Sequence, residues 1–212
     1  ANAYAIPGGQ RYRSPGRAAA EGDWSNAAFW LCAGAVGQGP VTVVGLDMDS
    51  AQGDRAVVDI LAAFGAKVRA HGGAVTVSPG DLRGVEVDAR DIPDLVPALA
   101  AVAAAARGDT IIRNAGRLRL KESDRIRTTA ALVRAFGAPV TETDDGLIVH
   151  GGGALRGAEV SSKGDHRIAM AAAVLAAACG DAATILGAHA CAKSYPAFFS
   201  DFKRLGGETE ER

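Results

Sequence analysis

The sequence contains few cysteines and few aromatic residues. Its 212 residues include three cysteines, and only 5% of them are aromatic. Cys32, Cys179 and Cys191 are odd in number and do not have the close spacing of metal ligands. Two of them lie in or at the end of alanine-rich stretches, as is typical of buried, reduced thiols. We therefore expect a cytoplasmic protein without a metal site.

The sequence also has almost no net charge and no long hydrophobic run. Its formal net charge is -1, and residues of both signs are interspersed. Such a balance excludes binding to nucleic acid or to an anionic membrane through bulk electrostatics, so any anionic ligand must be held by local groups. The alanine-rich stretches at 97–106 and 169–179 are too short to span a bilayer and are bounded by charge. We find no signal peptide at the start.

A repeat organises the chain. Asp23, Asp94 and Asp165 follow one another at equal intervals of about 70 residues, and each precedes an apolar, alanine-rich segment of about a dozen residues. An aspartate directly before such a segment is typical of a helix N-cap. The pattern therefore predicts three equivalent buried helices, each capped by one of these aspartates.

The segments after these helices also correspond. Each predicted helix is followed by a β-branched strand, a polar loop and a second helix that ends at glycine. The predicted strands are Val41 to Val44, Thr110 to Ile112 and Thr184 to Leu186, and the helix ends are Gly65, Gly137 and Gly206. Two copies continue into alternating strands at Ala74 to Val77 and Leu147 to Val149. We predict an α/β (α+β) fold of three βαβαββ units, the last incomplete.

The start of the chain differs from the repeat. Residues 1–16 are rich in glycine and proline, as linkers are. We interpret residues 1–16 as a crossover from a missing N-terminal lobe and residues 17–212 as a C-terminal lobe. The chain is therefore expected to be a fragment.

Charged side chains recur at the predicted helix entrances. A helix N-terminus presents unpaired N–H groups and a partial positive charge, so several converging ends would bind phosphate or carboxylate. Two carboxylates accompany the cations, as proton transfer to or from an anionic substrate would require. The cations are Lys121, Arg125, Arg167 and Lys193, and the carboxylates are Asp94 and Glu122.

Each motif alone has a simpler interpretation. Charged runs at helix starts are mostly solvated, and a capping aspartate usually only caps. His166, beside Asp165, is better explained as a structural, hydrogen-bonding histidine than as a general base. The recurrence of charged groups at equivalent points of the repeat is what indicates a site.

Five motifs follow one another in a specific order along the chain. They are YRSPG at residue 12 with EGDWS at 21, DIPD at 91, LRLKESDR at 118, GDHRIAM at 164 and AKSYP at 192. In this order they resemble the motifs of the 5-enolpyruvylshikimate-3-phosphate (EPSP) synthase family, also called 3-phosphoshikimate 1-carboxyvinyltransferases. The resemblance covers nearly the whole chain. It implies an inside-out α/β barrel lobe whose buried helices are parallel, in agreement with the repeat.

The resemblance implies transfer of the enolpyruvyl group of phosphoenolpyruvate to the 5-hydroxyl of shikimate 3-phosphate, in aromatic amino-acid biosynthesis. It implies no metal or organic cofactor. Asp94 resembles the carboxylate that contacts the shikimate hydroxyls and takes the 5-hydroxyl proton, with Lys121 beside it. Glu122 resembles the acid that protonates the methylene carbon.

The remaining roles also follow from the resemblance. Lys193 is a further candidate for proton transfer, and Asp23, Asp165 and His166 are supporting residues. The cations implied around phosphoenolpyruvate are Arg125, Arg167 and Lys193. Arg117 stands where some family members have an amide that contacts shikimate 3-phosphate, so it is not assigned to the site.

The resemblance also sets limits. The family's N-terminal lobe, with its share of the substrate contacts, has no counterpart in the chain, so we expect this chain alone to turn over little or nothing. The parent enzyme is expected to be a monomer and a glyphosate target. Two alternatives stay open: a lobe of the related UDP-N-acetylglucosamine enolpyruvyl transferase type, and a non-catalytic anion-binding domain.

Overall fold

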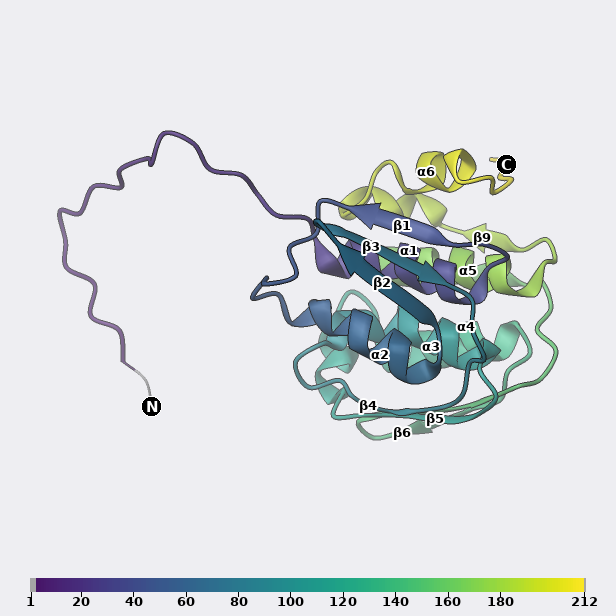
Figure 1. Cartoon of the computed structure of the whole chain (residues 1–212). Coiled ribbons are helices and arrows are strands. Elements are labelled where there is room, and N and C mark those ends of the chain that lie inside the picture. The colour runs from purple at the N-terminus through teal and green to yellow at the C-terminus, as the bar shows by residue number, and fades with distance from the viewer. Residues whose placement is uncertain (1–2, 212) are drawn as a thin grey trace.

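The computed structural model describes residues 3–211 of the chain. Residues 3–20 are exposed and extend away from the folded body, with a single turn at Gly8 and Gly9 (Figure 1). The first two residues of the expected 1–16 crossover lie outside the described residues. The folded body begins near Gly22, whose N–H donates to the carbonyl of Gly45.

The body contains six α-helices, nine strands and four short 3-10 helices (η) within the described residues. The α-helices are α1 (Trp24–Val36), α2 (Val57–Phe64), α3 (Val96–Ala105), α4 (Arg125–Ala135), α5 (His166–Cys179) and α6 (Phe198–Arg204). The strands are β1 (Val41–Val44), β2 (Lys67–His71), β3 (Ala74–Ser78), β4 (Glu86–Asp88), β5 (Gly108–Arg113), β6 (Val140–Thr143), β7 (Gly146–Gly151), β8 (Glu159–Ser161) and β9 (Thr184–Leu186). The 3-10 helices are η1 (Gly53–Ala56), η2 (Pro93–Leu95), η3 (Gly116–Leu120) and η4 (Ala188–Lys193). No described helix has the length and apolar character needed to cross a membrane.

The strands form three separate sheets that agree with the predicted repeat. The middle unit has the order β4-β5-β7-β6, in which β4 pairs parallel with β5 and the hairpin β6–β7 pairs antiparallel. The first unit has β1-β3-β2, which corresponds to β5-β7-β6. The third has the parallel pair β8-β9, which corresponds to β4-β5. The predicted strand positions are confirmed within two residues at each end.

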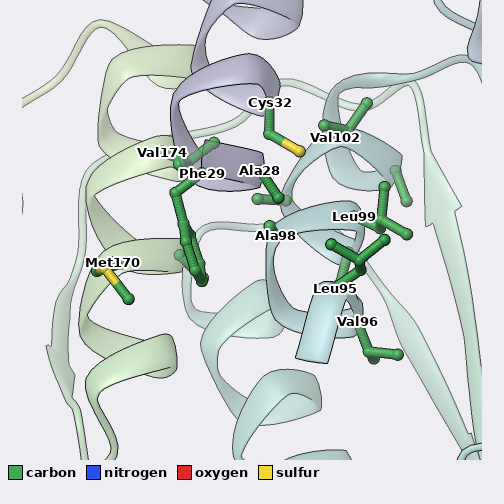
Figure 2. Packing of buried hydrophobic residues seen from close by; sticks show 14 of the residues in the cluster. Ala28, Phe29, Cys32, Leu95, Val96, Ala98, Leu99, Val102, Met170 and Val174 are labelled. Atoms are coloured by element: carbon green, nitrogen blue, oxygen red, sulfur yellow. The ribbon is translucent and has the colours of Figure 1, made fainter. Parts of the chain in front are cut away.

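Helices α1, α3 and α5 fill the centre between the sheets (Figures 1 and 2). In α3, every residue from Val96 to Ala104 is buried, which explains why this segment is apolar on all sides. Alanine has no side chain beyond Cβ, so its abundance lets the three helices pack closely. Phe29 lies between α1 and α5, and Leu99 and Met170 are fully buried on other faces of α3 and α5. The core therefore fixes the positions of the three helix N-termini relative to one another.

Left-handed residues end both the outer helices and the strands that follow the three central helices. Gly65, Gly137 and Gly206 have φ of 101°, 101° and 94°, so the predicted glycine helix ends are confirmed. A second set, which was not predicted, lies directly after β1, β5 and β9: Gly45, Asn114 and Gly187, with φ of 82°, 60° and 73°. At these points each strand turns sharply into its polar loop.

Two of the three expected aspartate caps are present. Asp23 accepts hydrogen bonds from the backbone N–H groups of Ser25 and Asn26 at the start of α1, and Asp165 accepts from that of Arg167 at the start of α5. The expected cap by Asp94 is wrong. Asp94 lies inside the 3-10 turn η2, which precedes α3, and its carboxylate makes no capping bond because it pairs with basic side chains instead.

Candidate active site

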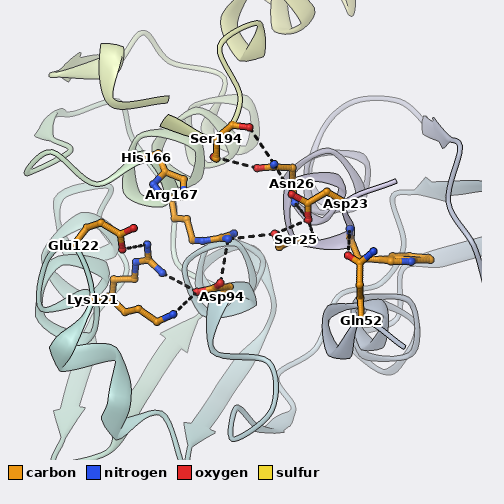
Figure 3. A network of polar contacts seen from close by, with 12 residues as sticks. Asp23, Ser25, Asn26, Gln52, Asp94, Lys121, Glu122, His166, Arg167 and Ser194 are labelled. Carbon is orange, nitrogen blue, oxygen red and sulfur yellow. Dashed lines mark hydrogen bonds and ion pairs between the residues drawn. The ribbon is translucent and has the colours of Figure 1, made fainter. Parts of the chain in front are cut away.

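The N-terminal ends of α1, α3, α4 and α5 bring their charged side chains together (Figure 3). Asp94 comes from η2 before α3, Arg125 is the first residue of α4, and Arg167 lies in the first turn of α5. Lys193 ends η4 and reaches the same cluster. The six residues predicted from the sequence as cations and carboxylates are therefore neighbours in space.

Arg125 forms the centre of this cluster. Its side chain is only 1% exposed, and its guanidinium contacts three carboxylates. The Nε and Nη2 groups donate to the two oxygens of Asp165 at 2.7 and 3.2 Å. Nη1 donates to Asp94 at 2.8 Å and Nη2 to Glu122 at 2.5 Å. The planar guanidinium, with its five N–H donors, suits this role because it can serve several acceptors in fixed directions.

Asp94 is surrounded by three cations. Its Oδ1 lies 2.8 Å from Arg125 and 3.3 Å from the Lys121 Nζ, and its Oδ2 lies 3.1 Å from the Nη2 of Arg167. Burial would raise the pKa of Asp94, but the charges of Arg167, Lys121 and Arg125 outweigh burial and hold it below its usual range. Asp94 is therefore ionised at neutral pH and can accept a proton or a hydrogen bond.

Glu122 pairs with Arg125 on one oxygen and with Lys193 on the other. The hydrogen bond from Lys193 is the largest influence on this carboxyl, and together with the charge of Arg125 it lowers the pKa of Glu122 to about 2. Lys193 is 57% exposed, whereas its partner is 26% exposed. This pair thus lies at the solvent side of the cluster.

Arg167 links the cluster to α1. Its Nη2 donates to the Ser25 hydroxyl at 3.2 Å as well as to Asp94. Ser25 in turn donates from its hydroxyl to Asp23, the α1 cap. The Nε and Nη1 atoms of Arg167 are buried and have no hydrogen-bond partner among the described residues. Because buried polar atoms are normally paired, two donors of this guanidinium are available for a further acceptor.

The supporting residues have different positions. Asp165 is fully buried and, besides Arg125, accepts a hydrogen bond from the Ser123 hydroxyl at 3.0 Å. The expectation of a hydrogen-bonding His166 is wrong. Its Nδ1 is buried without a partner in the described part of the chain, because the nearest Asp165 oxygen is 3.9 Å away. Burial and then the charge of Arg167 lower the pKa of His166, which favours the neutral ring.

The segment that carries Lys121 and Glu122 is braced by the turn between β6 and β7. Arg119 donates from Nε to the carbonyl of Asp144 at 3.0 Å and from Nη2 to that of Thr143 at 2.7 Å. It also pairs with Asp124, the N-cap of α4. The backbone N–H of Asn114 donates to the Asp145 carboxylate. Arg117 is exposed.

A second polar group, which was not predicted as part of the site, lies beside the cluster. Asp54 in η1 lies within electrostatic range of Asp94, Arg167 and Asp23. Burial, followed by the charge of Asp94, raises its pKa to about 6. Gln52 precedes it, accepts from the Trp24 N–H at 2.9 Å and donates to the carbonyl of Gly22 at 3.0 Å. Gln52 and Asp54 lie in a polar loop that is equivalent in the repeat to the loop containing Glu122, and this equivalence could have indicated them as site residues.

The cluster has more cations than carboxylates. Four basic side chains converge with the carboxylates of Asp94, Glu122 and Asp165. No group of three His, Cys, Asp or Glu side chains within residues 3–211 is placed to hold a metal ion. Cations at helix N-termini attract phosphate and carboxylate groups. The carboxylates can exchange protons with such a ligand.

Solved structures with a similar fold define the class of fold. EPSP synthase from Acinetobacter baumannii matches with a TM-score of 0.73 and 30% identity, over 85% of this chain and 45% of that one. The enolpyruvyl transferase NikO from Streptomyces tendae matches in fold, with a TM-score of 0.70 and 24% identity over 89% of this chain and 44% of that one. The fold is thus that of enolpyruvyl transferases, the inside-out α/β fold expected from the motifs.

Sequence comparison identifies the family within this class of fold. The sequence model of EPSP synthase (3-phosphoshikimate 1-carboxyvinyltransferase) matches residues 1–202, and the chain belongs to this family. Proteins named 3-phosphoshikimate 1-carboxyvinyltransferase are 47% identical over 191 residues in Clostridium kluyveri and 46% identical over 197 residues in Methanopyrus kandleri. These matches cover 90% and 92% of this chain but 45% and 46% of the relatives, so the chain spans about half their length.

Proposed function

We propose that this chain forms the C-terminal lobe of an enzyme that moves the enolpyruvyl group of phosphoenolpyruvate to the 5-hydroxyl of shikimate 3-phosphate and releases phosphate. Family membership supports the proposal. The observation that carries it is the convergence of two ionised carboxylates with four cations at the helix ends. An addition–elimination reaction between two anionic substrates needs both kinds of group.

Asp94 is proposed to bind the shikimate hydroxyls and to accept the 5-hydroxyl proton. Its low pKa keeps it ionised, so it is ready to accept a hydrogen bond. A carboxylate with such a low pKa is a weak base in the free site. Binding of an anionic substrate would draw Lys121 and Arg167 toward the substrate, weaken their hold on Asp94 and raise its basicity.

Glu122 and Lys193 are proposed to deliver the proton to the methylene carbon of phosphoenolpyruvate. In the free chain Glu122 is ionised, because its pKa is about 2. An anion that competes for Lys193 would leave Glu122 with fewer positive neighbours and favour its protonation. The proton then passes to carbon, and reversal of the transfer accompanies loss of phosphate from the tetrahedral intermediate.

The cations are proposed to bind phosphoenolpyruvate. Arg167 supports this role most directly, since its Nε and Nη1 donors are buried and unpaired in the described chain. Arg125 directs four of its five N–H donors to carboxylates, so it mainly contributes charge and holds Asp94 and Glu122 in place. Such preorganised charge stabilises the developing anion without rearrangement during the reaction.

The facing lobe is proposed to supply the remaining substrate contacts. The matched relatives are about twice as long as this chain. We further propose that residues 1–16 cross over to that lobe and that residues 17–212 form this one. The chain alone should therefore show little or no turnover, because orientation of two substrates accounts for much of the rate.

The test uses a chimera in which this chain replaces the matching half of the Clostridium kluyveri relative. Phosphate release from phosphoenolpyruvate plus shikimate 3-phosphate is measured for the chimera and for this chain alone. We expect turnover by the chimera only. Glu122→Gln and Asp94→Asn should each reduce its kcat by at least about 100-fold, whereas Asp59→Asn, an exposed carboxylate on α2, should leave it unchanged.

Three outcomes would contradict the proposal. One is a cooperatively melting chimera that releases no phosphate. Another is release of phosphate with UDP-N-acetylglucosamine but not with shikimate 3-phosphate, which would assign the lobe to the related sugar-nucleotide enzyme. The last is unchanged turnover in Glu122→Gln.

A further inference from the structure

Asn26, in the first turn of α1, contacts the segment that carries Lys193. Its Nδ2 donates to the Ser194 carbonyl, and the Ser194 hydroxyl donates to its Oδ1, both at 3.4 Å (Figure 3). The same Nδ2 donates to Asp23 at 2.7 Å, so the amide is oriented by the cap of α1. These bonds connect two parts of the chain that are 168 residues apart.

A second side chain of α1 holds the next residue of that segment. Trp30, one turn after Asn26, donates from Nε1 to the Tyr195 hydroxyl at 3.2 Å. Tyr195 donates in turn to Asp201 in α6 at 2.8 Å. The Trp30 ring stacks on Phe198 with a centroid distance of 4.8 Å. Residues 194 and 195 are thus fixed to one face of α1 at two points.

Lys193 directly precedes these anchored residues. Its own side chain is more than half exposed and forms an ion pair with Glu122. A long, flexible lysine loses considerable side-chain entropy when held in one position. If the backbone of Lys193 is already fixed, less conformational entropy is lost when the side chain is held on Glu122. A loose backbone would let Lys193 leave Glu122 for solvent.

We propose that Asn26 is a positioning residue that holds the Lys193 segment so that Lys193 stays on Glu122. Neither our assignment of the reaction nor the family motifs give Asn26 a role. The inference rests on the proposed function only for its catalytic meaning, because the Asn26, Ser194 and Lys193 contacts are properties of this chain. Asn26 acts through the Ser194 backbone and does not touch Glu122 itself.

The titration of Glu122 reports this coupling. The charged or titratable groups that face its carboxyl are Arg125 of α4, Lys193 of η4 and His166 of α5. Of these, Lys193 has the largest effect, and it lowers the pKa of Glu122 to about 2. Arg125 is buried and fixed by Asp165, so it stays in place when α1 is altered. A change in Glu122 after mutation of Asn26 therefore reflects movement of Lys193.

The experiment follows the Glu122 carboxyl carbon by NMR during a pH titration of the full chain, which needs no turnover. Asn26→Ala should raise the pKa of Glu122 by about half a unit, roughly a threefold change in its dissociation constant. Ser194→Ala removes only one of the two bonds and should give a smaller rise. His189→Ala, an exposed side chain in η4, is the matched control and should give none. Lys193→Ala should give the full rise, with no further effect from Asn26→Ala.

The proposal fails if Asn26→Ala and Ser194→Ala melt like the parent chain and leave the Glu122 titration unchanged. It also fails if His189→Ala raises the pKa as much as Asn26→Ala does. If Asn26→Ala does not fold, the titration of Ser194→Ala tests the proposal, because this variant keeps the backbone carbonyl that accepts the hydrogen bond from Asn26. A merely structural role would lower the melting temperature and leave the pKa of Glu122 where it is. Failure of the chimera to release phosphate would leave this result intact.

Discussion

The charge cluster has a buried half and an exposed half, and the two differ in what they do. Arg125 and Asp165 are both out of solvent, at 1% and 0% exposure, and are joined by two hydrogen bonds. Lys193 and Glu122 share one contact at the solvent side. Buried charges are costly to separate, whereas exposed pairs contribute little to stability. The buried half therefore holds the fold, and the exposed half is free to respond to a ligand.

The largest effect should come from breaking the buried half. Arg125→Met leaves the Asp165 carboxylate buried without its partner and removes the shared cation of Asp94 and Glu122. We expect unfolding to become easier by about 3–5 kcal/mol. Denaturant unfolding measures this. Arg127→Met, an exposed arginine on the same helix, is the control and should change stability by less than about 0.5 kcal/mol. If Arg125→Met and Arg127→Met lowered the free energy of unfolding equally, the buried half would not hold the fold.

A smaller effect of opposite sign is expected at Asp54. Its pKa in the folded chain, about 6, lies above its ordinary value, so its ionised form opposes folding at high pH. Asp54→Asn should therefore stabilise the chain by about 1 kcal/mol at pH 8, allowing for its partial exposure. The gain should fade as the pH falls through 6 toward the ordinary range. Thermal melting of both proteins from pH 4 to pH 8 checks this, and a gain that does not depend on pH would contradict it.

The smallest effect is expected at the exposed half. Glu122 has a pKa of about 2 in the folded chain, so its pairing stabilises the fold above its ordinary pKa and is lost as the pH falls through 2. Lys193→Ala should cost less than about 1 kcal/mol at pH 7, because the pair is exposed. The difference from the parent chain should shrink between pH 4.5 and 2. Measurement is by denaturant unfolding at each pH. A loss as large as that of Arg125→Met would show that the exposed half also holds the fold.

Much of the fold could be predicted because the repeat consists of residue types with clear preferences for helices, helix caps or turns. Alanine-rich segments after Asp23 and Asp165 became capped inner helices, and glycine at 65, 137 and 206 ended the outer ones. At Asp94, by contrast, local preference did not predict the structure. Its equivalence in the repeat predicted a cap, but three cations compete for its carboxylate, and they come from segments distant in the sequence.

The site was predictable as a set of residues but not as a network. The motifs identified the charged residues, since their order along the chain is specific. They did not reveal that Arg125 would pair with three carboxylates, or that Asp54 and Asn26 would lie nearby. Such partnerships depend on how far each loop reaches across the helix ends, which local patterns do not encode.

The hairpin tip at Asp144 and Asp145 carries a practical consequence. Tips of exposed hairpins are usually the safest places to insert a tag or to join a new chain end. Here the backbone carbonyl of Asp144 accepts a hydrogen bond from Arg119, and the Asp145 carboxylate accepts one from the N–H of Asn114. The tip therefore supports the segment that carries Lys121 and Glu122. An insertion there would disturb residues 121 and 122 before it disturbed the sheet. The exposed lead at residues 3–20 makes no such contacts with the body and is the better attachment point.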